Sequence, residues 1–334
     1  MRVRAWPRVS IVVLNWNGLQ DTLECIDSII GSDYPNFNVI VVDNGSTDGP
    51  PEAIRERHPE VHLIRNDRNM GFAGGNNVGI RSALGTGADL VWLLNNDTVV
   101  EKNALSQLVS ASIESQDIGL ASPVIRYYDE RETIQFRGSY IDWKEKRIIH
   151  MGKVDRDIDK NTPICVWGTA LLIKRSSIDK IGLLDEKYFA YHEDEEYSMR
   201  AIRAGLRNIV VPRAEIYHKN SRSTGSNDAP FQVFLRSRNT YFLWMDTLQG
   251  WNRIFHIPRY LSDIVAYGGS LTAKRLPDSV EACLDGVWHA FRGVGGPKNP
   301  EITMPPPLRG LFRFLLLFLY FSGSFSPAAC SQNR

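Results

Sequence analysis

Short apolar runs rich in β-branched residues recur through the first 125 residues of this 334-residue chain, and each is separated from the next by enough residues for a helix. Uninterrupted apolar runs of this kind are typical of parallel strands that are covered on both faces. The alternation predicts an α/β domain with a mostly parallel central sheet flanked by helices. The runs are Val9 to Leu14, Asn38 to Val42, Val61 to Arg65, Asp89 to Leu94 and Ile118 to Ile125.

The pattern changes three times after residue 125. Residues 126–160 are richer in charge and have no helical period, which predicts a hairpin or loop insertion. Apolar strands return at Ile164 to Ile173 and at Asn208 to Val211, whereas the chain from Phe231 onward has a helical pattern. We therefore expect one domain over residues 1–225, with two halves that meet near residue 125, and a helical C-terminal region over residues 226–334.

Composition excludes several classes of protein. The net charge of +1 and the scattered basic residues give no sign of nucleic-acid binding. The four cysteines form no CxxC pair, which argues against a zinc or redox motif and favours a reducing compartment. The N-terminal run Val9 to Leu14 is too short for a signal peptide. The apolar stretch Leu311 to Phe321 contains Arg313 and is shorter than the roughly 20 residues that a membrane span needs.

Polar clusters directly follow three of the predicted strands. They are Asn15 to Gly18, Asp43 to Asp48 and Asn95 to Asp97. In open α/β sheets, ligands bind beyond the carboxyl ends of the strands, so these clusters mark an expected binding edge. There, Asp43 can accept a hydrogen bond from a base or a ribose. The alternative is that Asp43 and Ser46 only cap the next helix.

The segment Asn69 to Asn77 combines glycines with asparagines and opens a predicted helix. Its backbone amides and asparagine side chains can line a nucleotide pocket. Its small residues can equally serve tight packing of the helix on the sheet, and both roles are compatible. The chain has neither a Walker A sequence nor a GxGxxG motif, so the usual phosphate and dinucleotide loops are excluded.

Two acidic positions and one histidine suggest chemistry that depends on a metal ion. Asp97 ends a predicted strand and offers an oxygen ligand of the kind that Mg²⁺ and Mn²⁺ prefer. His218 follows a short strand-like run and offers a nitrogen ligand, although a lone histidine is more often a satisfied core or surface residue.

The second acidic position is a run of four acids, Glu193 to Glu196, at the start of a helix predicted over about 193–204. Acids favour a helix N-terminus, but four in succession exceed what that role needs. We predict that Asp194 is a general base that takes a proton from a hydroxyl. Composition alone does not separate Asp194 from Glu193 or Glu195.

Ordered motifs over roughly residues 8–245 carry a resemblance to a known family. They are VSIVVLNWNG at 9–18, VVDNGSTDG at 41–49, NMGFAGGNN at 69–77, LLNND at 93–97, GTALL at 168–172, GLLDE at 182–186, and then Glu193-Asp194. With these motifs the chain resembles the family 2 glycosyltransferases of the GT-A fold, especially the rhamnosyltransferase-like branch. The resemblance implies a GT-A domain whose first 125 residues bind the nucleotide and whose residues 126–225 bind the acceptor.

The resemblance also implies an activity, which is inverting transfer of one sugar from a nucleotide-diphosphate donor. Asp194 matches the catalytic base of the family, Asp43 its contact to the base of the nucleotide, and His218 its late metal-binding histidine. Asn95-Asn96-Asp97 occupies the position of the DxD motif, with Asp97 as the remaining metal ligand. We expect Mg²⁺ or Mn²⁺ as cofactor. The predicted nucleotide-sugar contacts are Asn15, Asn17, Asp43, Ser46, Asn69, Asn76, Asn95, Asn96 and Asp97.

Two departures from the family pattern matter. Asn95 stands at the first position of the DxD motif, which removes one negative charge from the expected metal site. The QxxRW motif of processive polysaccharide synthases is absent, and Arg236-Ser-Arg-Asn239 stands in the later part of the chain instead. We therefore expect transfer of a single sugar residue rather than polymerisation.

The branch resemblance suggests dTDP-L-rhamnose as donor and a cell-surface glycan on a polyprenyl lipid carrier as acceptor, with UDP-galactose, UDP-glucose and UDP-galactofuranose as open alternatives. Aromatic and basic residues are mixed in the C-terminal third, which suits peripheral contact with a membrane. Leu311 to Tyr320 would dock there, at the cytoplasmic inner face of the cell membrane. The alternatives are that these aromatic residues form the core of a helical appendage or a homodimer interface.

Two other functions compete with sugar transfer. A nucleotidyltransferase that makes nucleotide sugars would carry a glycine-rich, basic phosphate loop after its first strand, where this chain has Asn15-Trp-Asn-Gly18. A non-catalytic nucleotide-sugar-binding protein would fit the change at Asn95. The presence of Asp97, Asp194 and His218 argues against the second possibility.

Overall fold

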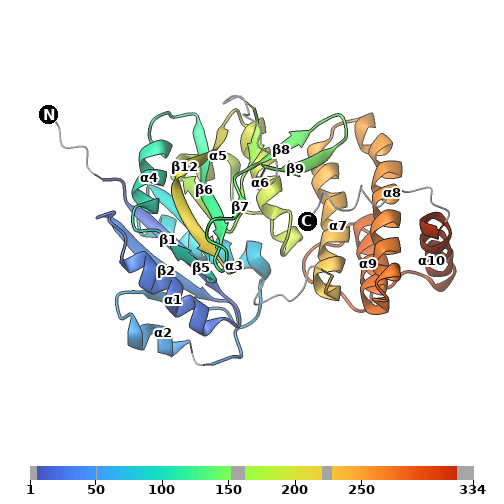
Figure 1. Ribbon diagram of the computed structural model, residues 1–334, viewed down its shortest axis with the longest axis horizontal. Helices are drawn as coiled ribbons and strands as arrows, with labels where there is room; N and C mark the ends of the chain where they lie inside the picture. The colour runs from blue at the N-terminus through green and yellow to red at the C-terminus, as the bar shows by residue number, and fades with distance from the viewer. Residues whose placement is uncertain (1–5, 50, 152–161, 220–227, 322–334) are drawn as a thin grey trace. The chain divides into compact units, whose positions relative to one another are not determined.

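The computed structural model describes residues 6–49, 51–151, 162–219 and 228–321 (Figure 1). The chain forms two compact units. The first comprises residues 1–185 and 193–223, and the second comprises residues 186–192 and 224–334. The boundary predicted between residues 225 and 226 falls outside the described residues. Residues 186–192 interrupt the first unit in sequence and belong to the second, which the sequence did not indicate.

The first unit is built on one large mixed sheet (Figure 1). Its first four strands in space are parallel neighbours, whereas β11 runs antiparallel between β4 and β6. Strand β12 is parallel to β6, and both β5 on β12 and β7 on β6 are antiparallel. The order is β3 (His62–Arg65), β2 (Phe37–Asp43), β1 (Val9–Asn15), β4 (Leu90–Asn95), β11 (Ala170–Lys174), β6 (Ile118–Tyr127), β12 (Arg207–His218) and β5 (Thr98–Val100), with β7 (Ile134–Phe136) beside β6.

Helices cover both faces of this sheet, because successive strand residues point to opposite sides. Val9, Ile11 and Val13 of β1 belong to one apolar core, and Val12 belongs to the other. The first core is completed by α1 (Leu19–Ile30), α2 (Glu52–Arg57) and α4 (Ala104–Ser112), and the second by α3 (Gly71–Gly85), α5 (Arg175–Ile181) and α6 (Glu193–Arg203). The predicted α/β architecture is confirmed.

Helix α3 packs unusually close to β1, as its small residues predicted. A Cβ atom on Gly79 would lie 2.2 Å from Cγ1 of Val12, and one on Gly75 would lie 2.5 Å from Cδ1 of Leu14. No side chain fits at either position unless the side chain of Val12 or of Leu14 moves. The two glycines therefore hold the N-terminal end of α3 beside the carboxyl ends of β1 and β2.

The region after β6 differs from the sequence prediction in one respect. The expected strand Ile164 to Ile173 is wrong as a single element, because β10 (Ile164–Cys165) pairs with β8 and β11 pairs with β4. The four residues between them, 166–169, cross from the small sheet to the large one. The predicted hairpin insertion is confirmed by β8 (Ser139–Asp142) and β9 (Arg147–His150), which are antiparallel.

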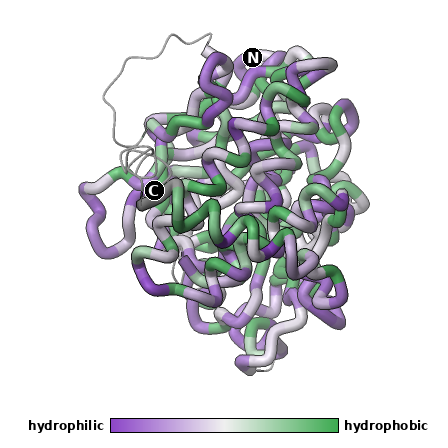
Figure 2. Tube along the Cα trace, turned by 90° about the vertical axis from the view of Figure 1, so that its right-hand side faces the viewer, coloured by the Kyte–Doolittle hydropathy of each residue, from purple (hydrophilic) through white to green (hydrophobic). Residues whose placement is uncertain are grey.

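The second unit is helical, as its sequence pattern predicted. It contains the short 3-10 helix η2 (Glu186–Tyr188) and the helices α7 (Pro230–Thr247), α8 (Trp251–Ala273), α9 (Pro277–Phe291) and α10 (Pro306–Phe321) around their own core. Hydrophobic and hydrophilic residues are interspersed along the trace (Figure 2). Within the described residues, no helix is both long and apolar enough to span a bilayer.

Candidate active site

Asp97 and His218 meet at the edge of the large sheet because β5 pairs with the end of β12. In that pairing Thr98 lies opposite His218, and the amide of Lys219 donates to the carbonyl of Asp97 at 2.9 Å. Oδ1 of Asp97 lies 3.1 Å from Nε2 of His218, and both side chains are only 9% exposed. Two residues that are distant in sequence thus form one buried polar pair.

Gln135 of β7 orients the imidazole of His218. Its Oε1 lies 2.8 Å from Nδ1 of the ring. An amide oxygen only accepts hydrogen bonds, so Nδ1 carries a proton, and Nε2 faces the carboxylate of Asp97. From that position Nε2 donates a hydrogen bond to Asp97 when the ring is protonated and offers a lone pair to a cation when the ring is neutral. The carboxylate oxygen and the ring nitrogen would repel each other if both presented lone pairs at this distance. A cation or a proton between them removes that repulsion.

The spacing of these two donor atoms suits a small divalent cation. Two ligands placed about 2.1 Å from a cation at right angles lie about 3.0 Å apart. The 3.1 Å separation of Asp97 Oδ1 and His218 Nε2 agrees with that geometry. No set of three or more His, Cys, Asp or Glu side chains that could hold a metal occurs in the part of the chain that the structure describes. A cation here would therefore complete its coordination with substrate oxygens and water.

The electrostatic surroundings keep Asp97 ionised. Burial alone would raise the pKa of its carboxyl, but the charge and hydrogen bond of His218, with the charge of Lys219, outweigh burial and hold the pKa below its ordinary value. Lys219 itself is 9% exposed, and its ammonium binds Asp21 at 2.6 Å and Glu24 at 2.5 Å. It thereby ties the end of β12 to the start of α1.

Asp194 lies in the first turn of α6, where two backbone amides hold its carboxylate. The amide of Gly168 donates to Oδ2, and the amide of Glu195 donates to Oδ1, both at 2.8 Å. A Cβ atom on Gly168 would lie 2.9 Å from the ring of Phe72, so only glycine lets the amide come this close.

The loop that holds Asp194 also contacts the DxD position. The carbonyl of Thr169, the residue after Gly168, accepts a hydrogen bond from the amide of Asn95 at 2.9 Å. The amide of Gly168 holds Asp194. Two consecutive residues of one loop therefore connect Asp194 to the end of β4, which leads directly into Asp97.

Glu193 differs from Asp194 in its environment. It is 5% exposed, and its Oε2 is buried with no hydrogen-bond partner among the described residues. Burial, followed by the charge of Asp194, raises the pKa of Glu193 well above its ordinary value. The protonated form of Glu193 is thus favoured, so neighbouring acids of similar sequence context have different chemistry.

The predicted nucleotide contacts after β1 and β2 form one hydrogen-bond network. Nδ2 of Asn15 donates to Oδ1 of Asp43 at 3.0 Å and to Oγ of Ser46 at 3.1 Å. Ser46 also accepts from the amide of Asn17, and Oδ1 of Asn17 accepts from the amide of Thr47 at 2.7 Å. Asp43 makes no other side-chain hydrogen bond with the described residues. Its second oxygen has no side-chain partner in the described structure, whereas Asn15, Asn17 and Ser46 hold the two loops together.

The asparagines before and within α3 are also engaged with the protein. Oδ1 of Asn69 accepts from the amide of Gly71 at 2.7 Å and from Nδ2 of Asn44 at 3.0 Å. Nδ2 of Asn76 donates to the carbonyl of Phe72 at 3.0 Å, while its Oδ1 is buried and has no partner in the described structure. Asn69 therefore stabilises the start of the helix, and Asn76 leaves one acceptor unused.

Asn95 and Asn96 have opposite surroundings although they are adjacent. Nδ2 of Asn96 is within hydrogen-bond distance of Oδ1 of Asn15, the carbonyl of Gly18 and Oγ1 of Thr22, at 3.0–3.3 Å. The half-buried side chain of Asn95 makes no hydrogen bond with any described residue. Asn96 is therefore part of a hydrogen-bond network, whereas the side-chain amide of Asn95 has no partner among the described residues. Ligand contact by either residue remains a prediction.

Sequence analysis missed three residues that organise this edge. Gln135 lies in a charge-rich insertion with no motif, so no sequence signal points to it. Lys219 follows His218 directly, and its proximity to a predicted ligand was the only available signal. Asn44 lies in the second polar cluster, where its Oδ1 accepts from Met70 N and Asn66 Nδ2, both at 3.0 Å.

Known proteins show similarity to this chain at the level of sequence and of fold. An N-acetylglucosaminyl-diphospho-decaprenol L-rhamnosyltransferase of Mycobacterium tuberculosis is 29% identical over 238 residues, which cover 65% of this chain and 77% of the relative. The galactofuranosyltransferase GlfT1 of Mycolicibacterium smegmatis is 26% identical over 188 residues, which cover 54% and 61% of the two chains.

A solved structure has the same fold. It is the mannosyltransferase PcManGT from Pyrobaculum calidifontis in complex with GDP-Man and Mn²⁺, which aligns with a TM-score of 0.53 at 19% identity, over 95% of this chain and 86% of that one. The sequence model of glycosyl transferase family 2 matches residues 10–182, which include the ends of β1, β2 and β4. The chain is a glycosyltransferase with a GT-A fold, and it belongs to glycosyl transferase family 2.

Proposed function

We propose that this enzyme transfers a single L-rhamnose from dTDP-L-rhamnose, with inversion, to a hydroxyl of a glycan carried on a polyprenyl lipid. The acceptor oxygen attacks the anomeric carbon on the face opposite the nucleotide. The bond between that carbon and the diphosphate oxygen breaks, and the nucleoside diphosphate leaves with the electron pair. Asp194 takes the proton of the attacking hydroxyl.

One observation carries this proposal, namely the contacts that connect Asp97, His218 and Asp194 through the end of β4. Asp97 and His218 are 3.1 Å apart, and Asp194 is held by the loop that also binds the end of β4. The reaction needs a site for the diphosphate and a base beside it. Asp97 and His218 are the candidates for the first requirement, and Asp194 is the candidate for the second.

Asp97 and His218 are the residues that would hold a divalent cation, Mg²⁺ or Mn²⁺. Such a cation supplies neutralisation of the negative charge that develops on the departing diphosphate. The donor atoms, their spacing and the orientation of His218 by Gln135 fit that role. The structural relative PcManGT was solved with Mn²⁺ and a nucleotide sugar, which supports the same expectation here.

Asp194 is a better base than its neighbour Glu193 for a physical reason. A base must be ionised before it accepts a proton. Burial favours the protonated form of Glu193, whose Oε2 also has no partner in the described structure. The carboxylate of Asp194 accepts hydrogen bonds from two backbone amides, and such bonds favour the charged form.

The nucleotide would lie along the ends of β1 and β2. One oxygen of Asp43 is bound by Asn15, and the other, which has no side-chain partner among the described residues, would accept a hydrogen bond from the base. The amide of Asn95, which likewise has no partner there, would face the donor. Asn15, Asn17, Ser46, Asn69 and Asn96 would shape that surface through their contacts with the protein. Asn76 would contribute through its unused acceptor.

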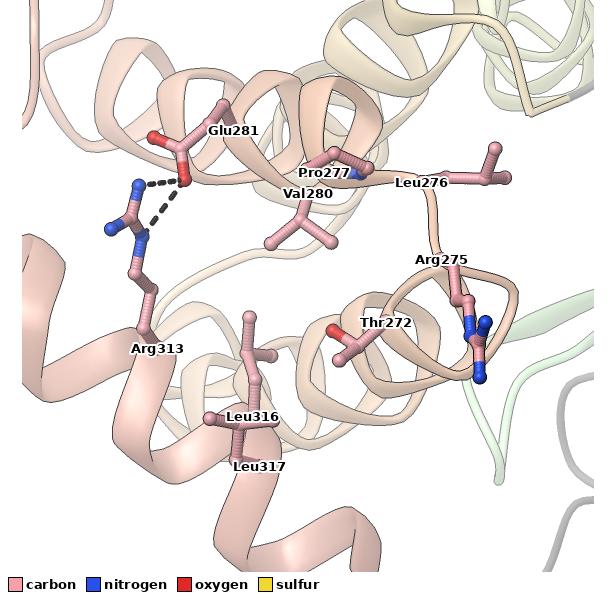
Figure 3. A pocket seen from close by; sticks show the side chains of 9 residues that line it. All are labelled: Thr272, Arg275, Leu276, Pro277, Val280, Glu281, Arg313, Leu316 and Leu317. Carbon is pink, nitrogen blue, oxygen red and sulfur yellow. Dashed lines mark hydrogen bonds and ion pairs between the residues drawn. The ribbon is translucent and has the colours of Figure 1, made fainter.

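Peripheral contact with the inner face of the cell membrane is the part of the proposal that concerns the second unit. On α10, four apolar side chains are 45–60% exposed, namely Leu311, Phe314, Leu317 and Phe318. Helices α8, α9 and α10 also line a pocket of about 360 Å³ that is open to solvent, into which Val280 and Leu316 project (Figure 3). Exposed apolar area of this kind is typical of helices that lie in a membrane interface.

The transfer reaction tests the catalytic proposal. Radiolabelled dTDP-L-rhamnose, UDP-galactose, UDP-glucose and UDP-galactofuranose are offered with a membrane lipid extract, and labelled lipid is measured. We expect transfer from dTDP-L-rhamnose, none with Asp194→Asn, and unchanged nucleotide binding by that variant. Wild-type transfer by Asp194→Asn would remove the base assignment.

The donor assignment has its own comparison. The similarity to a rhamnosyltransferase favours dTDP, whereas the similarity to GlfT1 favours UDP-galactofuranose as the second candidate. Thermal stabilisation by dTDP and by UDP in the presence of Mn²⁺ separates the two. A larger rise in the unfolding temperature with UDP would make UDP-galactofuranose the proposed donor in place of dTDP-L-rhamnose.

A further inference from the structure

The seven residues before α6 have an unusual backbone. Three of them that are not glycine have positive φ angles, namely Phe189 at 64°, Tyr191 at 67° and His192 at 71°. Residues with side chains rarely adopt this region, and such conformations persist only where the surroundings impose them. We name residues 186–192 the strap. The strap ends at His192, directly before Glu193 begins α6. Asp194 is the second residue of that helix.

Asn239 of α7 imposes much of this conformation. Its Nδ2 lies 2.8 Å from each of three strap carbonyls, those of Tyr188, Ala190 and Tyr191. Asn239 is fully buried, so water does not compete for these bonds. One side-chain amide thus gathers three backbone carbonyls that a regular helix or strand would direct elsewhere.

Arg238 reinforces the same segment from the neighbouring position. Its Nη2 donates to the carbonyls of Lys187 at 3.3 Å and Tyr188 at 3.0 Å, and its Nε binds Oδ1 of Asn239 at 2.9 Å. Its Nη1 donates to the carbonyl of Gly296 at 2.5 Å. All of these acceptors are uncharged, and burial lowers the pKa of this guanidinium to about 10.

Among the described residues this fully buried arginine has no carboxylate partner. Its burial is costly, because its charge leaves water for backbone dipoles and for the rings of Phe234 and Phe242. The cost at Arg238 therefore points to a use other than packing. The carbonyls that Arg238 and Asn239 bind belong mainly to the strap, which leads directly into the first turn of α6.

We propose that Arg238 and Asn239 are positioning residues for catalysis, which hold the strap so that the chain enters α6 with Asp194 in its working position. The proposal rests on the proposed function, because it takes Asp194 as the base. Displacement of a catalytic group by about 1 Å can cost on the order of a hundredfold in rate. Donor binding, which uses other residues of the first unit, does not depend on the strap.

Asn239→Ala tests this inference when it is compared with a matched control. The control is Tyr260→Phe, which removes the 2.8 Å hydrogen bond from Tyr260 to the carbonyl of Ser237 in the same unit but touches no strap carbonyl. We expect kcat to fall at least tenfold in Asn239→Ala, with KM for the donor within about threefold of wild type. Tyr260→Phe keeps kcat within about twofold.

A milder variant covers the case in which Asn239→Ala does not fold. Thr240→Val removes the 3.2 Å contact between Oγ1 of Thr240 and Nε2 of His192 in the strap. We expect a smaller fall in kcat, about threefold or more, again with an unchanged KM for the donor. Circular dichroism and stabilisation by nucleoside diphosphate establish that each variant is folded.

The outcomes separate this inference from the proposed function. Wild-type kcat in a folded Asn239→Ala variant, or in Thr240→Val when Asn239→Ala does not fold, overturns the positioning role. So does a fall in kcat that Tyr260→Phe matches. If Asp194→Asn abolishes transfer while Asn239→Ala keeps it, the proposed function stands without this inference. If Asp194→Asn transfers the sugar at the wild-type rate, the base assignment of the proposed function fails, and this inference fails with it.

Discussion

The orientation of His218 by Gln135 leads to a sharp prediction about metal affinity. The change is Gln135→Leu, which keeps a side chain of similar size and removes the oxygen that accepts the proton of His218 Nδ1 at 2.8 Å. Without that acceptor the ring can rotate, or it can carry its proton on Nε2. Either change turns the lone pair of Nε2 away from Asp97.

The size of the effect follows from the position of Gln135 behind a metal ligand. Loss of such a partner typically weakens metal binding 10- to 100-fold, or about 1.4–2.8 kcal/mol. His218 and Asp97 are both 9% exposed, so solvent does little to hold the ring in place. Gln135 itself is only half-buried, and a water molecule can partly replace it. We therefore expect a loss near the lower limit, about 10- to 30-fold.

A titration with Mn²⁺ at a fixed concentration of nucleoside diphosphate measures this loss. The readout is the midpoint of thermal unfolding, because a ligand stabilises the folded state in proportion to the logarithm of its concentration over its Kd. Gln135→Leu should shift the curve to about tenfold higher Mn²⁺ concentration. Gln135→Glu retains an acceptor and should not weaken binding.

Gln107→Leu is the matched control, since Gln107 is also half-buried in the first unit and its side chain makes no hydrogen bond within the described residues. Its Mn²⁺ curve should overlay that of the wild type. A Gln135→Leu curve that also overlays the wild type would refute the reasoning. In that case the imidazole of His218 would not be a metal ligand oriented by β7.

Three further predictions concern packing, pH and the nucleotide. Gly79→Ala places a methyl group 2.2 Å from Val12 and should lower the free energy of unfolding by about 1–3 kcal/mol in urea, whereas Gly85→Ala in the same helix, with open space around its Cβ, should not lower it. The raised pKa of Glu193 means that the folded chain keeps a proton that the unfolded chain loses above about 4.5. Wild-type stability therefore falls as pH rises above that value, so Glu193→Gln should gain stability relative to wild type between about pH 5 and pH 8. An equal difference in urea unfolding at both pH values would contradict this. Asp43→Asn keeps an acceptor but loses the charge, and calorimetry should show about tenfold weaker binding of nucleoside diphosphate, while an unchanged Kd would exclude Asp43 from the binding site.

Much of the first unit could be predicted because its signals are local. The five apolar runs correspond to strands β1, β2, β3, β4 and β6, and the acidic run begins α6 at Glu193 as expected. The four-residue crossing at 166–169 was missed, because apolar residues continue through it and periodicity alone shows no break. Strand β5 is three residues long and was missed for a related reason, since so short a strand exists only through its pairing with β12.

The backbone conformation of the strap could not be predicted from local sequence either. Nothing in Tyr188 to His192 marks a left-handed backbone, because none of these residues is glycine or asparagine. Their conformation depends on carbonyl contacts with Asn239, which lies about fifty positions later. In the sequence, Arg238 and Asn239 were noted only because Arg236-Ser-Arg-Asn239 stands in the later part of the chain, which lacks the QxxRW motif of processive polysaccharide synthases.

The sequence by itself determined which segments become strands and helices and which polar residues follow the strands, because periodicity and strand-end composition are properties of neighbouring residues. Only the tertiary structure decided which of those polar groups face one another. The pairing of β5 with β12 brings Asp97 to His218, the hydrogen bond of Gln135 sets the protonated nitrogen, and burial separates Glu193 from Asp194. Each of these depends on distances and on exclusion of water, which arise only when residues distant in the chain come together.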